Sequence, residues 1–398
     1  MKNFSLLILS LFCTTSFAQQ KQVQRATVAF MNVENLWDTV PSDDYIDGTL
    51  SKDNPAFHRS VPEDSLQYLE TTEDYQGEWS DDKLIGKKVI RKQILNTEFT
   101  ANSAKLWDSA KYNDKLGKLS KLISELGRQY TNTNPVIVGL IEVENRKVVE
   151  DLVKQPVLAK DDYGIVHYNS YDARGIDVAI IYQKKRFVPI HSLKKEVKIY
   201  NDDGKRNYTR DIVVVSGLLD GEKVAVLMNH WPSRSGGEAV SRPKRNAAAA
   251  ILKKQMDSLR ENIPGIKIFA MGDFNDDPVS PSVAKHLGAV GDAKQLSEKT
   301  PYLNLMYKLY KNGVASLAYR DAPNLFDQII VSKNLISDQL EKDYHIYKAE
   351  IFAPSYLVND SGQYKGYPLR SWNGNLYTGG YSDHFPAVSV IQREYVKP

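Results

Sequence analysis

The sequence predicts an α/β protein whose sheets mix parallel and antiparallel strands. Short apolar runs rich in β-branched residues recur along the 398 residues, and segments with helical periodicity lie between them. Asp220-Gly221 separates two of the apolar runs and is typical of a hairpin turn, which joins antiparallel strands. Helices and hairpins in one chain favour mixed sheets over a single all-parallel sheet.

The strands and helices follow from these patterns in chain order. Strands are expected at Ala26–Val33, Val136–Val143, Ile176–Tyr182, Ile212–Leu219, Val224–Met228, Ile266–Met271, Phe326–Ser332 and Pro386–Ile391. Helices are expected around Leu116, Leu119, Ile123 and Leu126, around Val148, Val149, Leu152 and Val153, and over Asn246–Leu259. No internal repeat interrupts this alternation.

Residues 39–112 have little periodicity and are rich in Asp, Ser, Thr and Tyr. We expect a long insertion with one helix near Lys87–Phe99. Asp43, Asp44 and Asp47 could bind a cation, but a solvated acidic loop is the favoured interpretation.

Composition excludes several classes of protein. Hydrophobic residues make up 42% and charged residues 25% of the chain, which excludes disorder as its main state. The net charge of +3 is too small for a protein that coats nucleic acid, although it permits a local basic cleft. The single cysteine excludes a disulfide-stapled scaffold.

The first twenty residues have the pattern of a signal peptide. Lys2 precedes the apolar run Phe4–Cys13, and Ser16-Phe17-Ala18 places small residues where a signal peptidase cleaves. We expect cleavage after Ala18 and a protein that is periplasmic or secreted. The run is too short to span a bilayer, so stable membrane insertion is not expected. A lipoprotein would use Cys13, where the bulky Phe12 before it is unfavourable. Residues 19–398 would then be a single catalytic domain without cysteine, which excludes thiol catalysis.

Polar residues gather at the ends of the predicted strands, where α/β proteins display functional groups. Asn32 and Glu34 end the first strand, and their spacing of two predicts that both face one side. Glu142 ends an otherwise apolar strand, where a carboxylate is costly unless it is paired or binds a metal. Asp273 and Asn275 repeat the spacing of two in the string Gly-Asp-Phe-Asn. An ion pair or a polar turn is the alternative in each case.

Three further strings carry anion-binding or acid–base residues. Arg174 precedes a strand and could contact phosphate or lie in solvent. The string from Met228 to Gly237 joins His230 with amide, hydroxyl, guanidinium and glycine groups suited to an oxyanion. Asp327 opens one strand, and Ser-Asp-His-Phe-Pro with His384 precedes the last. A histidine backed by an aspartate can be held charged, although a structural pair is the alternative.

Together these strings resemble the endonuclease/exonuclease/phosphatase superfamily, which includes enzymes similar to deoxyribonuclease I and exonuclease III. The match runs in order through nearly the whole chain, from Asn32 to His384. The resemblance implies a four-layer α/β sandwich, in which two mixed sheets pack face to face with helices outside. It also implies phosphoester hydrolysis with Mg²⁺, or with Mn²⁺ or Ca²⁺ in its place.

The resemblance implies a role for each matched residue. The implied catalytic residues are His230, Asp273, Asn275, Asp327 and His384; the implied metal-site residues are Asn32, Glu34, Glu142 and Asp383; and the phosphate- or substrate-binding residues are Arg174, Asn229, Ser233 and Arg234. Asp273 would orient or deprotonate the attacking water, and His384 would contact the scissile phosphate with Asp327 orienting it. The stretch from His230 to Ser233 lacks the Tyr and Asn typical of AP endonucleases, so abasic-site repair is not expected.

Three functions remain open on this sequence. We expect an exported, monomeric, metal-dependent nuclease or phosphodiesterase acting on nucleic acid. The first alternative is a phosphomonoesterase or lipid phosphodiesterase that uses the same site. The second is a non-catalytic phosphate-binding module, which the presence of Glu142, Asp273 and His384 disfavours.

Overall fold

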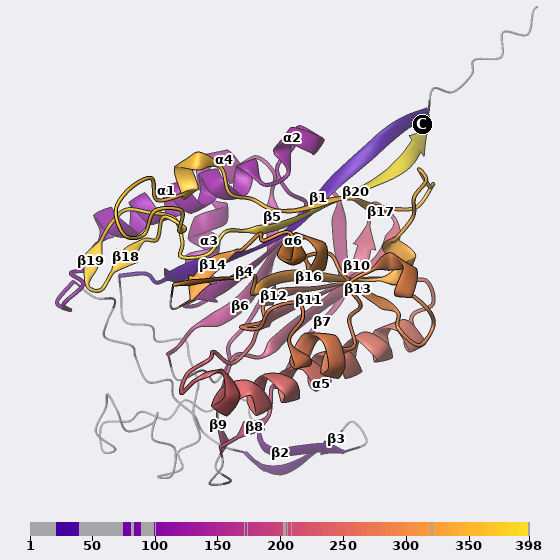
Figure 1. Cartoon of the computed structure of the whole chain (residues 1–398), viewed down its shortest axis with the longest axis horizontal. Helices are drawn as coiled ribbons and strands as arrows, with labels where there is room; N and C mark the ends of the chain where they lie inside the picture. The colour runs from indigo at the N-terminus through magenta and orange to yellow at the C-terminus, as the bar shows by residue number, and fades with distance from the viewer. Residues whose placement is uncertain are drawn as a thin grey trace, which may run out of the picture.

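Two six-stranded sheets face each other, and helices cover their outer surfaces (Figure 1). The computed structural model describes residues 21–39, 75–80, 83–88, 99, 101–170, 172, 174–201, 204, 206–207, 209–319 and 321–396. The predicted signal peptide and Asp43, Asp44 and Asp47 lie outside these residues. The described part confirms the four-layer α/β sandwich.

Each large sheet has a parallel pair of strands at its centre. The first sheet has the order β17 (His345–Ile351), β20 (Ala387–Val396), β1 (Lys21–Leu36), β4 (Ile137–Val143), β6 (Asp177–Gln183) and β5 (Tyr163–Tyr168). The second has the order β13 (Tyr302–Asn304), β16 (Asp327–Ser332), β12 (Lys267–Asp273), β11 (Glu222–His230), β10 (Ile212–Leu219) and β7 (Phe187–Lys195). Strands β1 and β4 are parallel, as are β11 and β12, and the other pairs are antiparallel.

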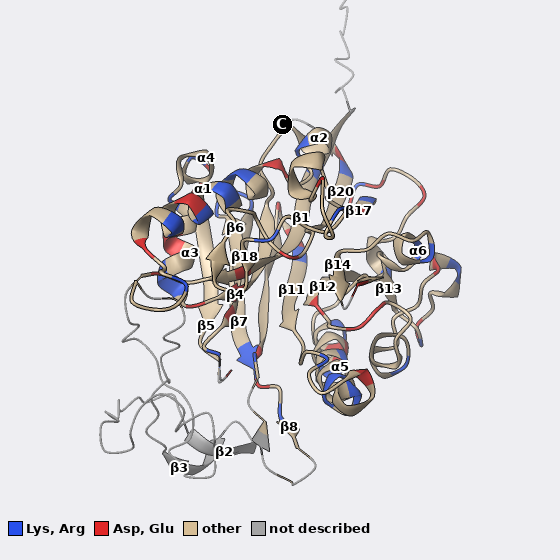
Figure 2. Ribbon diagram, turned by 60° about the vertical axis from the view of Figure 1, so that its left-hand side comes forward, with Lys and Arg blue, Asp and Glu red and all other residues tan. Residues whose placement is uncertain are grey.

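The three longest helices of the described chain lie outside the sheets because each buries one apolar face. The purple helices α1 (Ser109–Glu125), α2 (Arg128–Thr131), α3 (Arg146–Val153) and α4 (Pro156–Ala159) lie on the side of the first sheet, and α5 (Glu238–Asn262) covers the second (Figure 1). Asp108 caps α1 by accepting a hydrogen bond from the Lys111 N–H. The outer surfaces of α1 and α5 carry Lys and Arg (Figure 2), while α5 buries Ala248, Leu252 and Met256.

Shorter elements complete the described chain. They are β2 (Tyr75–Ser80), β3 (Lys83–Lys88), β8 (Ile199–Tyr200), β9 (Arg206–Asn207), β14 (Leu317–Tyr319), β15 (Ala322–Asn324), β18 (Trp372–Asn373), β19 (Leu376–Tyr377), α6 (Tyr307–Lys311), the π-helical turn Ser282–Leu287, and the 3₁₀ turns Ala293–Gln295, Lys333–Leu335 and Ser355–Leu357. The helix predicted near Lys87–Phe99 is wrong at Lys87 and Lys88, which lie in β3, and residues 89–98 lie outside the described residues.

A buried core fills the space between the sheets. Val28 and Phe30 of the first sheet and Met228 and Met271 of the second are fully or almost fully buried there. A Cβ at Gly139 would lie 2.0 Å from the sulfur of Met228. The missing side chain at Gly139 therefore lets Met228 pack against β4.

A cluster of aromatic rings joins the end of β1 to the β18–β19 hairpin. The fully buried Trp107 contacts Trp372 and Tyr377, with ring centroids 5.3 and 5.7 Å away. Its indole Nε1–H donates to the carbonyl oxygens of Trp37, at 3.0 Å, and Asp38, at 3.1 Å. Trp107 thereby anchors the chain that leaves the first sheet.

Trp107→Ala is expected to lower the free energy of unfolding by about 3–5 kcal/mol, because it removes a buried indole and leaves two carbonyl oxygens without their donor. Leu106→Ala is the control, since Leu106 is 60% exposed and should change stability by less than about 0.5 kcal/mol. Chemical denaturation of both variants measures the difference. Equal stability of the two variants would contradict this role.

Candidate active site

Three adjacent strands of the second sheet place polar residues side by side at one edge. His230 ends β11, Asp273 ends β12 and Asp327 begins β16. In the sheet register His230 pairs with Asp273, and Asp273 pairs with Asp327. Because the register fixes these neighbours, residues almost a hundred positions apart in the chain form one row.

The first sheet ends its parallel pair in the same way. Asn32 of β1 pairs with Ile141 of β4, and Glu142 follows at a break in the register with a φ of 63°. A left-handed φ is rare for a residue with a side chain and is common at functional positions. The turn at Glu142 breaks the strand's regular alternation.

His230 joins the two edges. Its Nε2 lies 3.8 Å from Glu142 Oε1 of the first sheet and 3.8 Å from Asp273 Oδ2 of the second. His384, in the loop before β20, reaches the same group of residues through Asp327, whose Oδ2 lies 2.7 Å from His384 Nδ1. The structure therefore brings His230, Glu142, Asp273, Asp327 and His384 together.

Local hydrogen bonds and left-handed backbone, rather than strand alternation, set the orientation of several predicted site residues. Asp273 Oδ1 accepts a hydrogen bond from Asn275 N–H, and Asn32 Oδ1 accepts one from Glu34 N–H, both at 2.8 Å. Glu34 and Asn275 each have a φ of 49°. The expectation that each pair shares one face of a strand is therefore wrong, because the backbone turns between the two residues.

Two more site residues sit on turns of the same kind. Asp172 accepts from the backbone N–H of Arg174 at 3.0 Å, and Ser382 accepts from that of His384 at 3.1 Å. In all four cases a side chain two residues earlier fixes the backbone of the functional residue. This local bond fixes the direction of the backbone at each functional residue.

Asp327 holds His384 in its charged form. Burial alone would lower the pKa of His384, but the Asp327 carboxylate and the charges of Asp383 and Asp273 raise this pKa well above its usual value. Asp327 is fully buried and also accepts a hydrogen bond from the Ser316 hydroxyl. Since Asp327 occupies Nδ1, the Nε2–H of His384 is left to donate to another group.

Asp273 and His230, unlike His384, have pKa values shifted toward the uncharged form. Burial, reinforced by Asp327 and Glu142, raises the pKa of Asp273 to about 7 despite His384 and the Asn275 N–H. Burial and the cations Arg210 and Arg174 lower the pKa of His230 well below its usual value, so its imidazole is neutral. A carboxyl group with a pKa near neutrality is suited to accept a proton.

Glu34 is held by residues from two separate segments, α1 and the loop that contains Arg370 and Ser371. Arg370 Nε donates to its Oε1 at 3.1 Å, the Ser371 N–H donates to its Oε2, and the buried Lys115 Nζ donates to its carbonyl oxygen at 2.9 Å. Burial and the charge of Asp383 raise the pKa of Glu34 to about 7, against the effect of Lys115 and Arg370. Asp383 lies 3.5 Å from Arg370 Nη2 and is 38% exposed.

Glu142 is the carboxylate best suited to a divalent cation. It is nearly buried, yet within the described chain its closest cation is the Arg174 guanidinium, with Nη1 at 4.0 Å, the neutral His230 ring lies 3.8 Å away, and no side chain donates a hydrogen bond to it. Among the described residues, no three or more His, Cys, Asp or Glu side chains are placed so that they alone could hold a metal ion. Mg²⁺ normally binds through one or two carboxylates together with water and substrate phosphate. Glu142, with the amide of Asn32 on the paired strand, fits that pattern.

A buried ion pair between Arg210 and Asp172 lies beside the exposed Arg174. Arg210 Nη1 donates to Asp172 Oδ2 at 2.9 Å, and Arg174 Nε lies 3.5 Å from Asp172 Oδ1. Arg210 also donates to the carbonyl oxygen of Trp231 at 2.7 Å. Arg174 keeps half of its side chain exposed beside Glu142. This exposed part of the side chain is free to contact a phosphate, and the role predicted for Arg174 stays a prediction.

The structure gives Asn229 and Arg234 supporting positions instead of the substrate contacts expected for them. Asn229 is fully buried, its Nδ2 donates to the Leu227 carbonyl at 2.9 Å, and its Oδ1 accepts from Trp231 Nε1 at 3.1 Å. Arg234 donates to the Asn275 carbonyl at 2.9 Å and to Asp276 at 3.2 Å.

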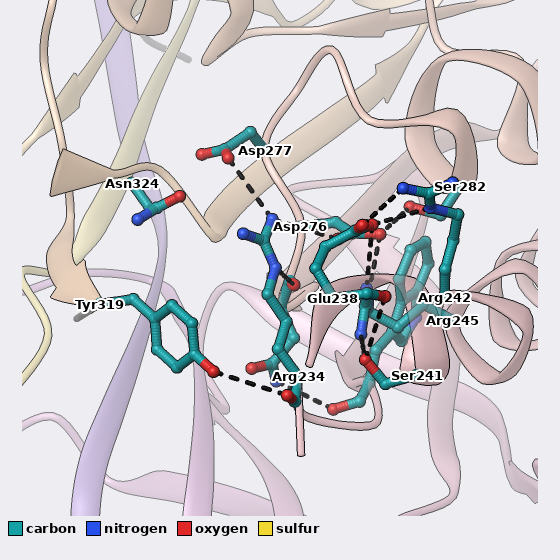
Figure 3. Close-up of polar contacts among 12 residues, drawn as sticks. Arg234, Glu238, Ser241, Arg242, Arg245, Asp276, Asp277, Ser282, Tyr319 and Asn324 are labelled. Carbon is teal, nitrogen blue, oxygen red and sulfur yellow. Dashed lines mark hydrogen bonds and ion pairs between the residues drawn. The ribbon is translucent and has the colours of Figure 1, made fainter. Parts of the chain in front are cut away.

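Figure 3 shows the guanidinium of Arg234 directed at Asp276 and Asp277, and only 12% of its side chain is exposed. Ser233 is exposed at the start of the same loop, and its carbonyl oxygen lies 3.5 Å from Arg245. Asn275 donates to the Trp231 carbonyl at 3.0 Å, which leaves one amide N–H for a ligand.

Five residues near the site are absent from the set that the sequence predicted. They are Lys115, Asp172, Arg210, Arg370 and Ser371. Asp172 lies two positions before Arg174, and this spacing, which suits a side chain that bonds the backbone two residues later, could have identified it. Lys115 and Arg370 lie in segments whose local sequence resembles any solvated helix or loop.

A family model described as the endonuclease/exonuclease/phosphatase family matches residues 89–393. The chain belongs to this family. It is therefore a hydrolase of phosphoester bonds, and enzymes of the family generally depend on a divalent metal ion. No curated protein sequence matches the chain.

Solved structures of low sequence identity are similar to this chain. A family protein from Bacteroides thetaiotaomicron is 14% identical, with a TM-score of 0.49, and the match covers 94% of this chain and 100% of that one. A humanized TDP2 of D. rerio is 16% identical, with a TM-score of 0.46, over 71% of this chain and 93% of that one. A mannosyl-6-phosphatase of Bacteroides thetaiotaomicron is 15% identical, with a TM-score of 0.45, over the same shares.

Asp327→Asn is expected to lower the pKa of His384, because it removes the charge that opposes the effect of burial. In the wild type the imidazole should stay protonated as the pH rises through neutrality, and in the variant it should lose its proton at lower pH. NMR titration of the histidine side chains in metal-free protein measures both values. Asp383→Asn is the control, since Asp383 Oδ1 lies 4.0 Å from Nε2 and should shift the pKa less. An unchanged titration in Asp327→Asn would refute the assignment.

Proposed function

We propose that the chain is a Mg²⁺-dependent nuclease or phosphodiesterase that hydrolyses phosphodiester bonds of nucleic acid. The observation that carries the proposal is the charged His384, held by Asp327 at 2.7 Å, beside an Asp273 whose pKa is raised to about 7. A cationic donor and a proton acceptor at one site supply the two proton-related roles of phosphoester hydrolysis.

Asp273 and His384 have different roles in the proposed hydrolysis. Asp273 accepts a proton from the attacking water, whose oxygen forms the new bond to phosphorus. His384 donates from Nε2 to a phosphoryl oxygen as negative charge grows there. The bond to the leaving oxygen breaks, and that oxygen takes a proton from water. A divalent ion held by Glu142 and Asn32 would neutralise phosphate charge and stabilise the leaving oxygen.

The arginines favour a phosphodiester polymer. Arg174, beside Glu142, and Arg370, beside Glu34 and Asp383, are each about half exposed, with 50% and 52% of the side chain accessible. The two arginines lie beside different carboxylates of the site. Each could therefore contact a different phosphate of one nucleic-acid strand. Arg234, the other arginine that the sequence predicted to bind substrate, is held by Asp276 and Asp277. A phosphomonoester dianion would favour more cations at one point than this arrangement offers.

Glu142→Gln and Asp273→Asn are each expected to lower kcat by at least about 100-fold while the protein stays folded, because each removes a charge from the reacting groups. Glu150→Gln, in a half-exposed ion pair on α3, is the matched control and should keep full activity. The assay offers single-stranded DNA, RNA, an inositol phosphate and sphingomyelin with Mg²⁺, Mn²⁺ or Ca²⁺, and with chelator. Hydrolysis of the inositol phosphate or of sphingomyelin alone would contradict the proposal, as would full activity in chelator.

We also propose that the protein is exported, on the basis of Lys2, Phe4–Cys13 and Ser16-Phe17-Ala18. In the described part of the chain no helix is both long and apolar enough to cross a bilayer. N-terminal sequencing of protein from the periplasm or culture medium should begin at Gln19. An intact Met1 would contradict cleavage.

A further inference from the structure

We propose that a pocket next to the candidate active site binds an unpaired nucleobase of the nucleotide whose phosphate is cleaved. This inference rests on the proposed nuclease function and adds a recognition site to it. The pocket has a volume of about 320 Å³, within the range of small-ligand sites. Arg370 and Asp383 line it, and the same two residues belong to the candidate active site. A nucleotide with its phosphate in the active site could therefore place its base in the pocket.

Aromatic side chains form one wall. Tyr364 and Tyr367 both line the pocket, with ring centroids 5.8 Å apart and a tilt of 52° between the rings. Tyr364 is 44% exposed although it lies beside apolar wall residues such as Leu317 and Leu369. An exposed aromatic ring at the mouth of a pocket offers a face on which a flat base can stack.

Asp321 provides a hydrogen-bond acceptor in the lining of the pocket. Its Oδ1 accepts a hydrogen bond from the Tyr367 hydroxyl at 2.9 Å, which orients the carboxylate and leaves Oδ2 to accept from a ligand. The exocyclic amino groups of cytosine, adenine and guanine can donate to such a carboxylate, whereas thymine offers only its ring N3–H, which lies between two carbonyl oxygens that the carboxylate repels. The pocket should therefore prefer the three amino bases.

The charges of the pocket argue against a second phosphate. Its charged lining residues are Asp321, Asp383 and Arg370, and the guanidinium of Arg370 is already bound to Glu34 at 3.1 Å. An anionic group in the pocket would meet an excess of negative charge. A neutral ring with donor groups suits this lining better than a polyphosphorylated headgroup.

The test compares Tyr364→Ala with Tyr347→Ala, since Tyr347 is equally exposed, at 43%, but lies on β17 and does not line the pocket. The substrates are single-stranded oligo(dC), oligo(dT) and an oligomer of abasic sites. Tyr364→Ala should lower kcat/KM on oligo(dC) by about 5- to 100-fold, the range for loss of one stacked base, and change the abasic rate by less than about 2-fold. Tyr347→Ala should match the wild type on all three.

Asp321→Asn provides a second measurement. Asp321 has a φ of 61°, a conformation that Asn adopts readily, so the fold should be kept. The variant should reduce the preference for oligo(dC) over oligo(dT).

Equal rates of the wild type and Tyr364→Ala on oligo(dC), or an equal loss on the abasic oligomer, would refute the base pocket while leaving the nuclease function intact. Hydrolysis of bis-p-nitrophenyl phosphate without cleavage of any oligomer by the wild type would refute the nuclease function, and the base pocket with it.

Discussion

The burial of several carboxylates where two sheet edges meet is the constraint on which the site depends. Glu34, Asp273 and Asp327 are each at most 3% exposed, and Glu142 is 9% exposed. Charges of one sign in a poorly solvated place repel each other, so each needs a cation, a donor or a proton. His384 donates a hydrogen bond to Asp327, and Arg370 and the Ser371 N–H donate to Glu34. Glu142 has no hydrogen-bond donor among the described side chains. The carboxylate left without a donor is the one that a metal ion would complete.

Strand register and one glycine place three of the site residues side by side. The row of His230, Asp273 and Asp327 is built from strand register, which regular backbone hydrogen bonds enforce. Gly272 precedes Asp273 with a φ of 150°, and a Cβ there would lie 1.9 Å from the Asn229 carbonyl oxygen. Only glycine lets β12 approach β11 closely enough for this row to form.

Much of the site could be predicted because polar residues interrupt apolar strands there. Glu142 and Asp273 end runs that are otherwise apolar, and a sheet brings such strand ends together whatever their separation in the chain. The spacing of Asn32 and Glu34 drew attention to both residues, but the expected shared strand face is wrong, since left-handed backbone at Glu34 replaces strand alternation. The edge strands β5, β7, β13 and β17 were missed, because their apolar periodicity is weak or short.

Residues that act through tertiary contacts could not be predicted. Arg234 lay in a loop rich in anion-binding groups, but Asp276 and Asp277 lie close enough in space to pair with it. Lys115 and Arg370 reach Glu34 from α1 and from a loop near the C-terminus. Single-sequence patterns carry no information on such pairings, which depend on where the two sheets and their loops meet.

In the proposed mechanism, side chains of both sheets converge on one cation and one phosphate. A crystal structure with Mn²⁺ and a mononucleotide would test this convergence, because anomalous scattering locates the metal. We expect a single anomalous peak within inner-sphere distance of the Glu142 carboxylate, with a phosphate oxygen hydrogen-bonded to His384 Nε2. A peak away from Glu142, or a phosphate out of reach of His384, would refute the mechanism.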